Sequence, residues 1–259
     1  MTKLTIQQTE EQLRAMSKVN APSTLASAVL AQVGLIDQYS SIQTPLGIGF
    51  VSWNRQGISA LMVLPDAAEF ERYFNDRFHR RLVSNDNPDR HFLSRVAAAL
   101  SGEKLDLAFD LRGLSDFERA VLVKARQIPR GEIRPYSWIA REIENPKAVR
   151  AVGSALGHNP IPLLIPCHRV VRSDGKIGNY LFGSESKRAM LELEGVDTQQ
   201  LEDFADHGVK YYGSDTTNIF CYPTCRHARR VTGKHLVTFS SEEEARAAGY
   251  RPCKVCRPA

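Results

Sequence analysis

The sequence predicts three parts: an α/β N-terminal domain, a mostly α domain that contains a helix-turn-helix, and a small α+β module held together by four cysteines. Residues 44–64 alternate apolar and polar side chains around a turn, which is typical of a hairpin. Capped amphipathic helices with short connections follow residue 115, and four of the five cysteines lie after residue 220. We expect domains at residues 1–110, 111–197 and 211–259, with residues 198–210 as a linker.

The composition is that of a globular intracellular protein. With 259 residues and 42% hydrophobic side chains, the chain can bury a core. The first thirty residues include charged side chains and lack an apolar block, so neither a signal peptide nor a spanning helix is predicted. We expect a cytoplasmic protein that binds no membrane and keeps its cysteines reduced.

The positive charge is concentrated in the two segments that contain the cysteines. Lys and Arg number 14 against 10 acidic residues in residues 111–197, and 8 against 4 in residues 211–259. In residues 1–110 they number 11 against 12, and the net charge of the chain is +5. This pattern indicates either a polyanionic partner, nucleic acid first, or a solvated basic surface.

The N-terminal part is predicted to be a scaffold. A capping box at residues 9–12 and a pattern at residues 22–33 predict two short helices. The hairpin of residues 44–64 turns at Asn54-Arg-Gln-Gly, and helices near residues 66–81 and 89–101 would cover it. Nothing in residues 1–110 has the spacing of a catalytic set.

The second part is predicted to contain the helix-turn-helix. A capping box at residues 115–118 begins a helix that ends near Gln127, where Ile128-Pro-Arg-Gly-Glu interrupts it. A second helix is expected from about residue 136 to 143. After a tight turn, Asn145 would cap a third helix with Pro146 in its first position.

The predicted third helix separates its apolar and polar side chains. Its apolar face holds Val149, Val152 and Leu156. Its exposed face holds Lys147, Arg150 and Ser154. This exposed face is either a DNA-binding surface or an ordinary solvated face.

Cys167 stands apart from the other cysteines. It follows Leu163-Leu-Ile, which would suit a core strand, and a buried free cysteine often acts as a small hydrophobic residue. However, Pro166 would end that strand, and His168 and Arg169 favour a thiolate at this position. We therefore favour a reactive cysteine.

These residues belong to a longer pattern of spaced motifs. The pattern includes Asn159-Pro, Pro166-Cys-His-Arg-Val, Gly178-Asn-Tyr and Glu194-Gly, together with Tyr136 and Arg150-Ala-Val-Gly. It resembles the O6-alkylguanine-DNA alkyltransferases closely over residues 115–197 and loosely over residues 1–110.

The resemblance implies a set of catalytic roles. Cys167 would accept the alkyl group, His168 would activate it through a water, and Glu194 would orient the imidazole while Asn159 fixes the active-site turn. Attack on an alkyl carbon gives a stable thioether. Each protein molecule would therefore repair one lesion.

The resemblance also implies double-stranded DNA carrying alkylated bases as partner. The damaged nucleotide must leave the helix. Arg150 would fill the gap from the minor groove, Tyr136 would assist rotation at the 3′ phosphate, and Tyr180 would line the pocket. Leu181-Phe-Gly, which follows Tyr180, departs from the smaller residues usual in the family and leaves the accepted alkyl size open.

The C-terminal cysteines have the spacing of a zinc site. Three residues separate Cys221 from Cys225, two separate Cys253 from Cys256, and 27 lie between the pairs. Two such knuckles indicate one tetrahedral Zn²⁺, and no organic cofactor is expected. On spacing alone, the metal could be purely structural.

The residues around these cysteines resemble the zinc domain of the Ada proteins. There the first ligand, whose position Cys221 holds, accepts a methyl group from a DNA phosphotriester. Methylation would reduce the charge of the site, and Arg226 and neighbouring basic residues could then bind DNA more tightly. The module follows the alkylguanine part here, whereas it precedes it in Ada, so a transcriptional role loses support. The fusion of the two parts suggests a bacterial protein, which we expect to be a monomer that associates with the nucleoid when it acts.

Two other functions fit parts of the sequence. A sensor would bind alkylated DNA for other repair factors, with the zinc module adding only DNA affinity. A cysteine hydrolase would turn over many times on a carbonyl substrate without DNA. Stoichiometric loss of activity separates alkyl transfer from both.

Overall fold

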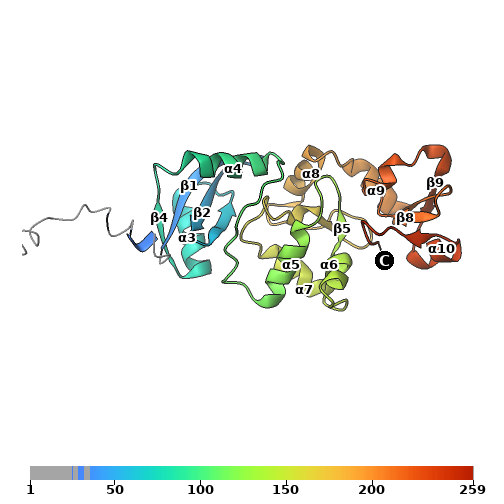
Figure 1. Ribbon diagram of the computed structural model, residues 1–259, viewed down its shortest axis with the longest axis horizontal. Coiled ribbons are helices and arrows are strands. Elements are labelled where there is room, and N and C mark those ends of the chain that lie inside the picture. The colour runs from blue at the N-terminus through green and yellow to red at the C-terminus, as the bar shows by residue number, and fades with distance from the viewer. Residues whose placement is uncertain (1–24, 26–28, 32–35, 259) are drawn as a thin grey trace, which may run out of the picture.

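The computed structural model describes residues 25, 29–31 and 36–258. Its three parts follow one another along the long axis of the molecule (Figure 1). The capping box at residues 9–12 lies outside the described residues, as does most of the helix expected at residues 22–33. In the described part, no helix is both long and apolar enough to cross a bilayer.

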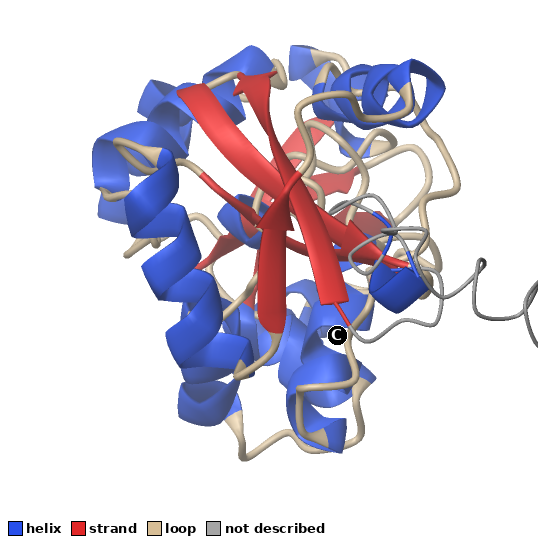
Figure 2. Cartoon of the chain, turned by 90° about the vertical axis from the view of Figure 1, so that its left-hand side faces the viewer, coloured by secondary structure: helices blue, strands red, loops and turns tan. Residues whose placement is uncertain are grey.

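The first part is a four-stranded sheet with two helices. Its elements are β1 (Ile36–Thr44), β2 (Gly47–Asn54), β3 (Gly57–Met62), α3 (Ala67–Phe78), β4 (Arg81–Ser84) and α4 (Arg90–Leu100). The strand order is β3-β2-β1-β4, and β4 runs parallel to β1. Figure 2 views the molecule from the end at which this sheet lies, with strands in red and helices in blue. The hairpin and both helices agree with the sequence prediction, whereas β1 and β4 were not predicted.

The second part contains the helix-turn-helix. Its elements are α5 (Asp116–Arg126), β5 (Arg134–Pro135), α6 (Tyr136–Glu142), α7 (Val149–Gly157), the 3₁₀ turn η1 (Cys167–Arg169), β6 (Val170–Val171) and α8 (Ser184–Leu193). The predicted capping box is present: Ser115 and Glu118 each bond the other's backbone N–H. Short strands β5 and β6 pair in parallel and join the start of α6 to the chain that follows Cys167.

Two local predictions were wrong. Helix α7 begins at Val149, because residues 145–148 form a turn closed by the N–H of Ala148 donating to the carbonyl of Asn145 at 3.0 Å. Neither Asn145 nor Pro146 therefore starts the helix, and Lys147 lies in the turn. Residues 163–165 form a turn instead of a strand, with Leu163 at a φ of 72°.

The third part has its own sheet. Its elements are α9 (Thr198–Asp206), β7 (Tyr211–Ser214), β8 (Ile219–Cys221), the 3₁₀ turns η2 (Ala228–Arg230) and η3 (Gly233–His235), β9 (Leu236–Phe239), α10 (Glu242–Ala247) and β10 (Arg251–Pro252). The strand order is β10-β8-β7-β9. Helix α9 occupies the stretch expected to be a linker, and it packs Leu201 against a cluster that also contains Leu191 of α8.

The second and third parts share a hydrophobic core. One cluster of buried side chains includes Trp138 and Ile128 together with Tyr222 and all four C-terminal cysteines. Arg134 reinforces this contact, because its guanidinium lies 5.7 Å from the Trp138 ring and 5.4 Å from the Tyr222 ring. The cysteine module is therefore packed directly on the helix-turn-helix part.

Candidate functional site

Cys167 is held at the start of η1 by Asn159. Its side chain is almost fully buried, with 5% of the residue exposed. Asn159 donates from Nδ2 to Cys167 Sγ at 3.2 Å and to the carbonyl of Ile165 at 2.9 Å, while its Oδ1 accepts from the N–H of Ile161 at 3.0 Å. Asn159 thus ties the turn of residues 159–167 to the sulfur.

His168 and Glu194 form a buried pair beside Cys167. His168 Nε2 lies 3.0 Å from Glu194 Oε1, and the same carboxylate accepts two bonds of 2.8 Å from Arg169. The backbone N–H of Gly131 donates to Oε2 at 3.1 Å. Glu194 lies at the end of α8, so this carboxylate connects three separate segments of the second part.

The charge states of this pair follow from burial and hydrogen bonding. Burial lowers the pKa of His168 from its ordinary value, although Glu194 acts in the opposite direction. Burial alone would raise the pKa of Glu194, but the bonds from His168 and Arg169 outweigh it and hold the pKa at about 2. At neutral pH, the geometry therefore pairs a neutral imidazole with a carboxylate.

This pairing fixes the tautomer of His168. An ionised carboxylate only accepts hydrogen bonds, so Nε2 carries the proton. The other ring nitrogen, Nδ1, is buried and has no hydrogen-bond partner among the described residues. His168 Nδ1 is thus free to accept a proton, which is what a base for the Cys167 thiol requires.

Lys187 is a buried cation that the sequence analysis missed. Its Nζ donates to the carbonyls of Val170 at 2.5 Å and Asn179 at 3.2 Å. Burial lowers the pKa of Lys187 to about 8. Burial also raises the pKa of Cys167, and the bond from Asn159 and the charge of Lys187 partly offset this effect.

Cys167 opens into a small cavity of about 170 Å³. Tyr136, Tyr180 and Leu181 line it, together with residues of α7. The ring of Tyr180 meets the ring of Phe182 edge-on at 5.5 Å, and Phe182 in turn packs on the aromatic cluster of the N-terminal sheet. The N-terminal domain therefore supports one wall of the cavity.

Of the residues predicted to contact DNA, Tyr136 and Tyr180 line this cavity. Tyr136 begins α6, and Gly153 and Gly157 of α7 line the cavity with it. Arg150 and Ser154 are exposed on α7. Lys147 is also exposed, but it lies in the turn before the helix and does not share its face.

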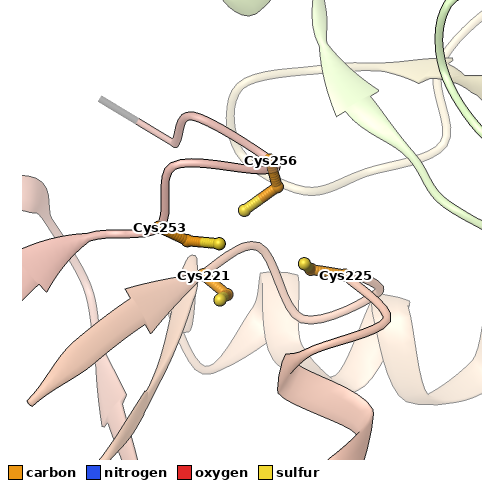
Figure 3. Close-up of side chains that lie close together, drawn as sticks. All are labelled: Cys221, Cys225, Cys253 and Cys256. Atoms are coloured by element: carbon orange, nitrogen blue, oxygen red, sulfur yellow. The ribbon is translucent and has the colours of Figure 1, made fainter. Parts of the chain in front are cut away.

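The four C-terminal cysteines converge (Figure 3). Their Sγ atoms all lie within 4.8 Å of one another. Zn–S bonds of about 2.3 Å in a tetrahedron place sulfur atoms roughly 3.8 Å apart, so the cluster fits one Zn²⁺. Cys221 ends β8 and Cys253 follows β10, which explains how two knuckles far apart in sequence meet. The cluster supports zinc binding.

The cysteines differ in their access to solvent. Cys225 and Cys256 are completely buried, whereas Cys221 and Cys253 line a cavity of about 460 Å³. The basic side chains around this cavity are those of His227, Arg230, His235, Arg251 and Lys254. A ligand could therefore reach the sulfur of Cys221 or Cys253 from a positively charged pocket.

Arg226 and Arg229 lie on the side of the module that faces the helix-turn-helix part. The backbone N–H of Arg226 donates to Glu132 Oε1 at 3.2 Å, and its side chain is exposed. The guanidinium of Arg229 donates to the carbonyl of Gly131. Arg229 thus serves a contact within the protein that sequence reasoning did not predict.

A sequence signal for Lys187 existed. Lys187, Met190 and Leu191 lie on the buried face of α8, at the spacing of one helical face. A lysine on an otherwise apolar face indicates a buried charge with a specific partner. The structure also explains the glycine at position 131. Its φ of 72° favours glycine, and a Cβ there would lie 2.7 Å from the carbonyl oxygen of Glu194.

Two described domain families match consecutive stretches of the chain. Residues 116–196 match "6-O-methylguanine DNA methyltransferase, DNA binding domain". Residues 198–259 match "Metal binding domain of Ada". The second match begins with α9.

Curated relatives are methylated-DNA–protein-cysteine methyltransferases. The protein of Mycobacterium bovis is 46% identical over 104 residues, which cover 39% of this chain and 62% of that relative. The protein of Methanosarcina barkeri is 35% identical over 158 residues, which cover 60% of this chain and 96% of the relative. The chain belongs to the methylated-DNA–protein-cysteine methyltransferase family.

A solved structure of the family supports the fold. The structure described as Mycobacterium tuberculosis OGT in complex with DNA has a TM-score of 0.52 and 33% identity to this chain. The match covers 64% of this chain and 99% of that one. The separate Ada match, over residues 198–259, follows the alkyltransferase match along the chain.

Proposed function

We propose that this protein repairs DNA by transferring a methyl or larger alkyl group from O6-alkylguanine to Cys167. The observation that carries the proposal is the buried set of Cys167, His168 and Glu194, with a free His168 Nδ1 and a small cavity at the sulfur. Family membership and the likeness to an alkyltransferase bound to DNA support it.

The proposed reaction is a direct displacement. Cys167 Sγ loses its proton, through a water, to His168 Nδ1 and attacks the alkyl carbon. The S–C bond forms as the C–O6 bond breaks, and the electron pair stays on the guanine oxygen. The proton that left Cys167 then passes from His168 through water to the guanine ring, which restores normal guanine. The thioether is stable, so one protein molecule acts once.

DNA would bind on the α6–α7 side of the cavity. A cavity of about 170 Å³ beside a buried sulfur cannot admit a base that remains stacked, so the nucleotide must rotate out at a cost of a few kcal/mol. We assign Arg150 to filling the gap, Tyr136 to the 3′ phosphate and Tyr180 to the wall of the pocket. Ser154, Lys147 and Arg226 would contact the DNA backbone.

A second function is favoured by the charged cavity of the zinc module. Cys221 lines this cavity beside Arg230, Arg251 and Lys254, which could hold a DNA phosphate. Four thiolates around one Zn²⁺ carry a formal charge of −2, which keeps a ligated sulfur nucleophilic. Cys221 would accept the methyl group of a methylphosphotriester.

We also infer domains at residues 1–110, 111–197 and 211–259, with one Zn²⁺ in the last.

Peptide mass spectrometry of the zinc-loaded protein tests both sites. Duplex DNA with O6-methylguanine should methylate Cys167, and Cys167→Ser should remain unmethylated. Methylphosphotriester DNA should methylate Cys221 and leave Cys253 bare, in the wild type and in Cys167→Ser. If Cys167 stays bare although the DNA binds, the chain is a sensor. If only Cys221 stays bare, the zinc module has a structural or DNA-binding role.

A further inference from the structure

One loop joins the zinc module to the proposed alkyltransferase site. It connects α5 to β5, and we call residues 127–133 the α5–β5 loop. Toward the active site, the N–H of Gly131 donates to Glu194 Oε2 at 3.1 Å. The carbonyl of Ile128 accepts from Arg169 at 2.6 Å, and β5 directly after the loop pairs with β6 directly after η1. The loop therefore contacts the segments that hold His168 and Glu194.

The other side of the loop contacts the knuckle of residues 221–226. Thr224 Oγ1 accepts from the N–H of Ile133 at 3.0 Å, and this bond is buried. The N–H of Arg226 donates to Glu132 Oε1 at 3.2 Å. Since Thr224 and Arg226 flank the ligand Cys225, the shape of the knuckle fixes where the loop is held.

The contact also completes the hydrogen bonding of a buried carboxylate. Glu132 is 3% exposed, and its Oε2 pairs with Arg134 at 2.5 Å. Its Oε1 accepts the hydrogen bond from the backbone N–H of Arg226. A buried carboxylate without such partners is costly, so the loop and the knuckle constrain each other. The exposed guanidinium of Arg229 also donates a hydrogen bond to the carbonyl of Gly131.

We propose that Thr224 and Glu132 are positioning residues for Cys167: the knuckle fixes the α5–β5 loop, and the loop fixes Glu194 and, through it, His168. This inference rests on the alkyl transfer proposed above. Loss of the Thr224 bond frees Ile133 and lets Gly131 move relative to the carboxylate. A shift of this kind reduces reactivity, because the imidazole no longer faces the thiol in a fixed orientation.

The test uses the full, zinc-loaded chain and one substitution with a conservative rescue. Thr224→Val keeps the shape of the side chain and removes the acceptor, whereas Thr224→Ser keeps the acceptor. Glu142→Gln is the matched control: Glu142 pairs with Arg257 across the same interface at 2.5 Å, and its other partner is Lys124 of α5 at 3.3 Å, so the change removes charge at the interface while the bonds of Gly131, Glu132 and Ile133 stay in place. Each protein is first checked for its zinc content.

Two rates and one NMR signal are compared. The first is the rate of methyl transfer from O6-methylguanine DNA, and the second is the rate at which iodoacetamide modifies Cys167 without DNA. In Thr224→Val we expect both rates to fall about tenfold with full zinc content. The side-chain ¹⁵N signal of His168 Nε2 should also move. Thr224→Ser and Glu142→Gln should match the wild type.

Wild-type rates and an unmoved His168 signal in Thr224→Val would overturn the proposal. If Thr224→Val fails to fold or loses zinc, Arg229→Met decides, since this exposed side chain contacts Gly131 from outside and should slow the iodoacetamide reaction in the same direction. Unchanged reactivity of Arg229→Met would then refute the proposal. If the wild type takes no methyl group from DNA, the proposed function fails, while the iodoacetamide rates still decide the positioning role.

Discussion

Individual residues around Cys167 have opposing effects on its reactivity. Burial raises the pKa of the thiol, while Asn159 and Lys187 favour the thiolate. The family motifs assigned Cys167, His168 and Glu194 to one site, and the structure places His168 Nε2 3.0 Å from Glu194 Oε1. Arg169 was expected to favour the thiolate, but it holds Glu194 instead. The sequence spacing of a cationic residue does not predict which distant carboxylate it will pair with in the folded protein.

Replacing Glu194 should change the stability of the protein in a pH-dependent way. The pKa of Glu194 falls from 4.5 to about 2 in the folded protein. A lowered carboxyl pKa stabilises the fold above pH 4.5, and this contribution disappears as the pH falls toward 2. We expect Glu194→Gln to cost about 3 kcal/mol at pH 7. Urea unfolding of both proteins at several pH values measures it, and a difference that does not shrink in acid would contradict it.

Removing the charge of Lys187 should make the Cys167 thiol less acidic. Lys187→Met keeps the length of the side chain but removes the cation that lowers the pKa of Cys167. The midpoint of the pH profile for iodoacetamide modification of Cys167 should therefore move to higher pH. Far-UV circular dichroism serves as the control for folding. A midpoint that stays in place in a folded variant would show that Lys187 acts only through the carbonyls of Val170 and Asn179.

At the scale of elements, short sequence patterns predicted the helix ends that depend on neighbouring residues. The capping box of α5 and the ends of α3 and α4 follow from short patterns. The start of α7 did not, because the Pro146 signal for a helix also suits the turn that forms there. Strand β4 was missed because it pairs with β1, which lies more than forty residues earlier in the chain.

The exposed face of helix α7 should affect how the protein binds DNA and should leave the reactivity of the Cys167 thiol unchanged. Arg150 is exposed on this helix and makes no side-chain hydrogen bond or ion pair with any described residue. We expect Arg150→Ala to slow methyl transfer from duplex DNA by roughly tenfold, because the extruded base then leaves an unfilled gap. Its iodoacetamide rate should equal that of the wild type. A single-turnover assay measures the first rate, and an equal loss in both would place Arg150 in the structure instead.

At the scale of the whole molecule, both flanking parts contact the active site. The N-terminal sheet donates from the N–H of Leu61 to the carbonyl of Pro160 at 2.9 Å, next to Asn159. The zinc module reaches Ile133 from Thr224, 91 residues later in the chain. Sequence patterns predicted each part but not these contacts, because they depend on how the parts pack.

Removing the metal should affect the third part first. Four sulfur atoms within 4.8 Å of one another fit one Zn²⁺, and a module of this size has little core of its own, so metal binding would stabilise its fold. A chelator should make residues 211–258 sensitive to protease while residues 36–197 remain protected, and it should slow methyl transfer to Cys167. Limited proteolysis with mass spectrometry measures this. Unchanged protection of the third part would contradict a folding role for the metal.

The stoichiometry of methyl transfer tests the central claim most directly. Protein is titrated with excess duplex DNA that carries a radiolabelled methyl group on guanine O6, and the label bound to the Cys167 peptide is counted. We predict a plateau at one methyl group per protein, and none in Cys167→Ser. DNA binding without label on the protein, or continued demethylation beyond one equivalent, would contradict direct transfer to Cys167.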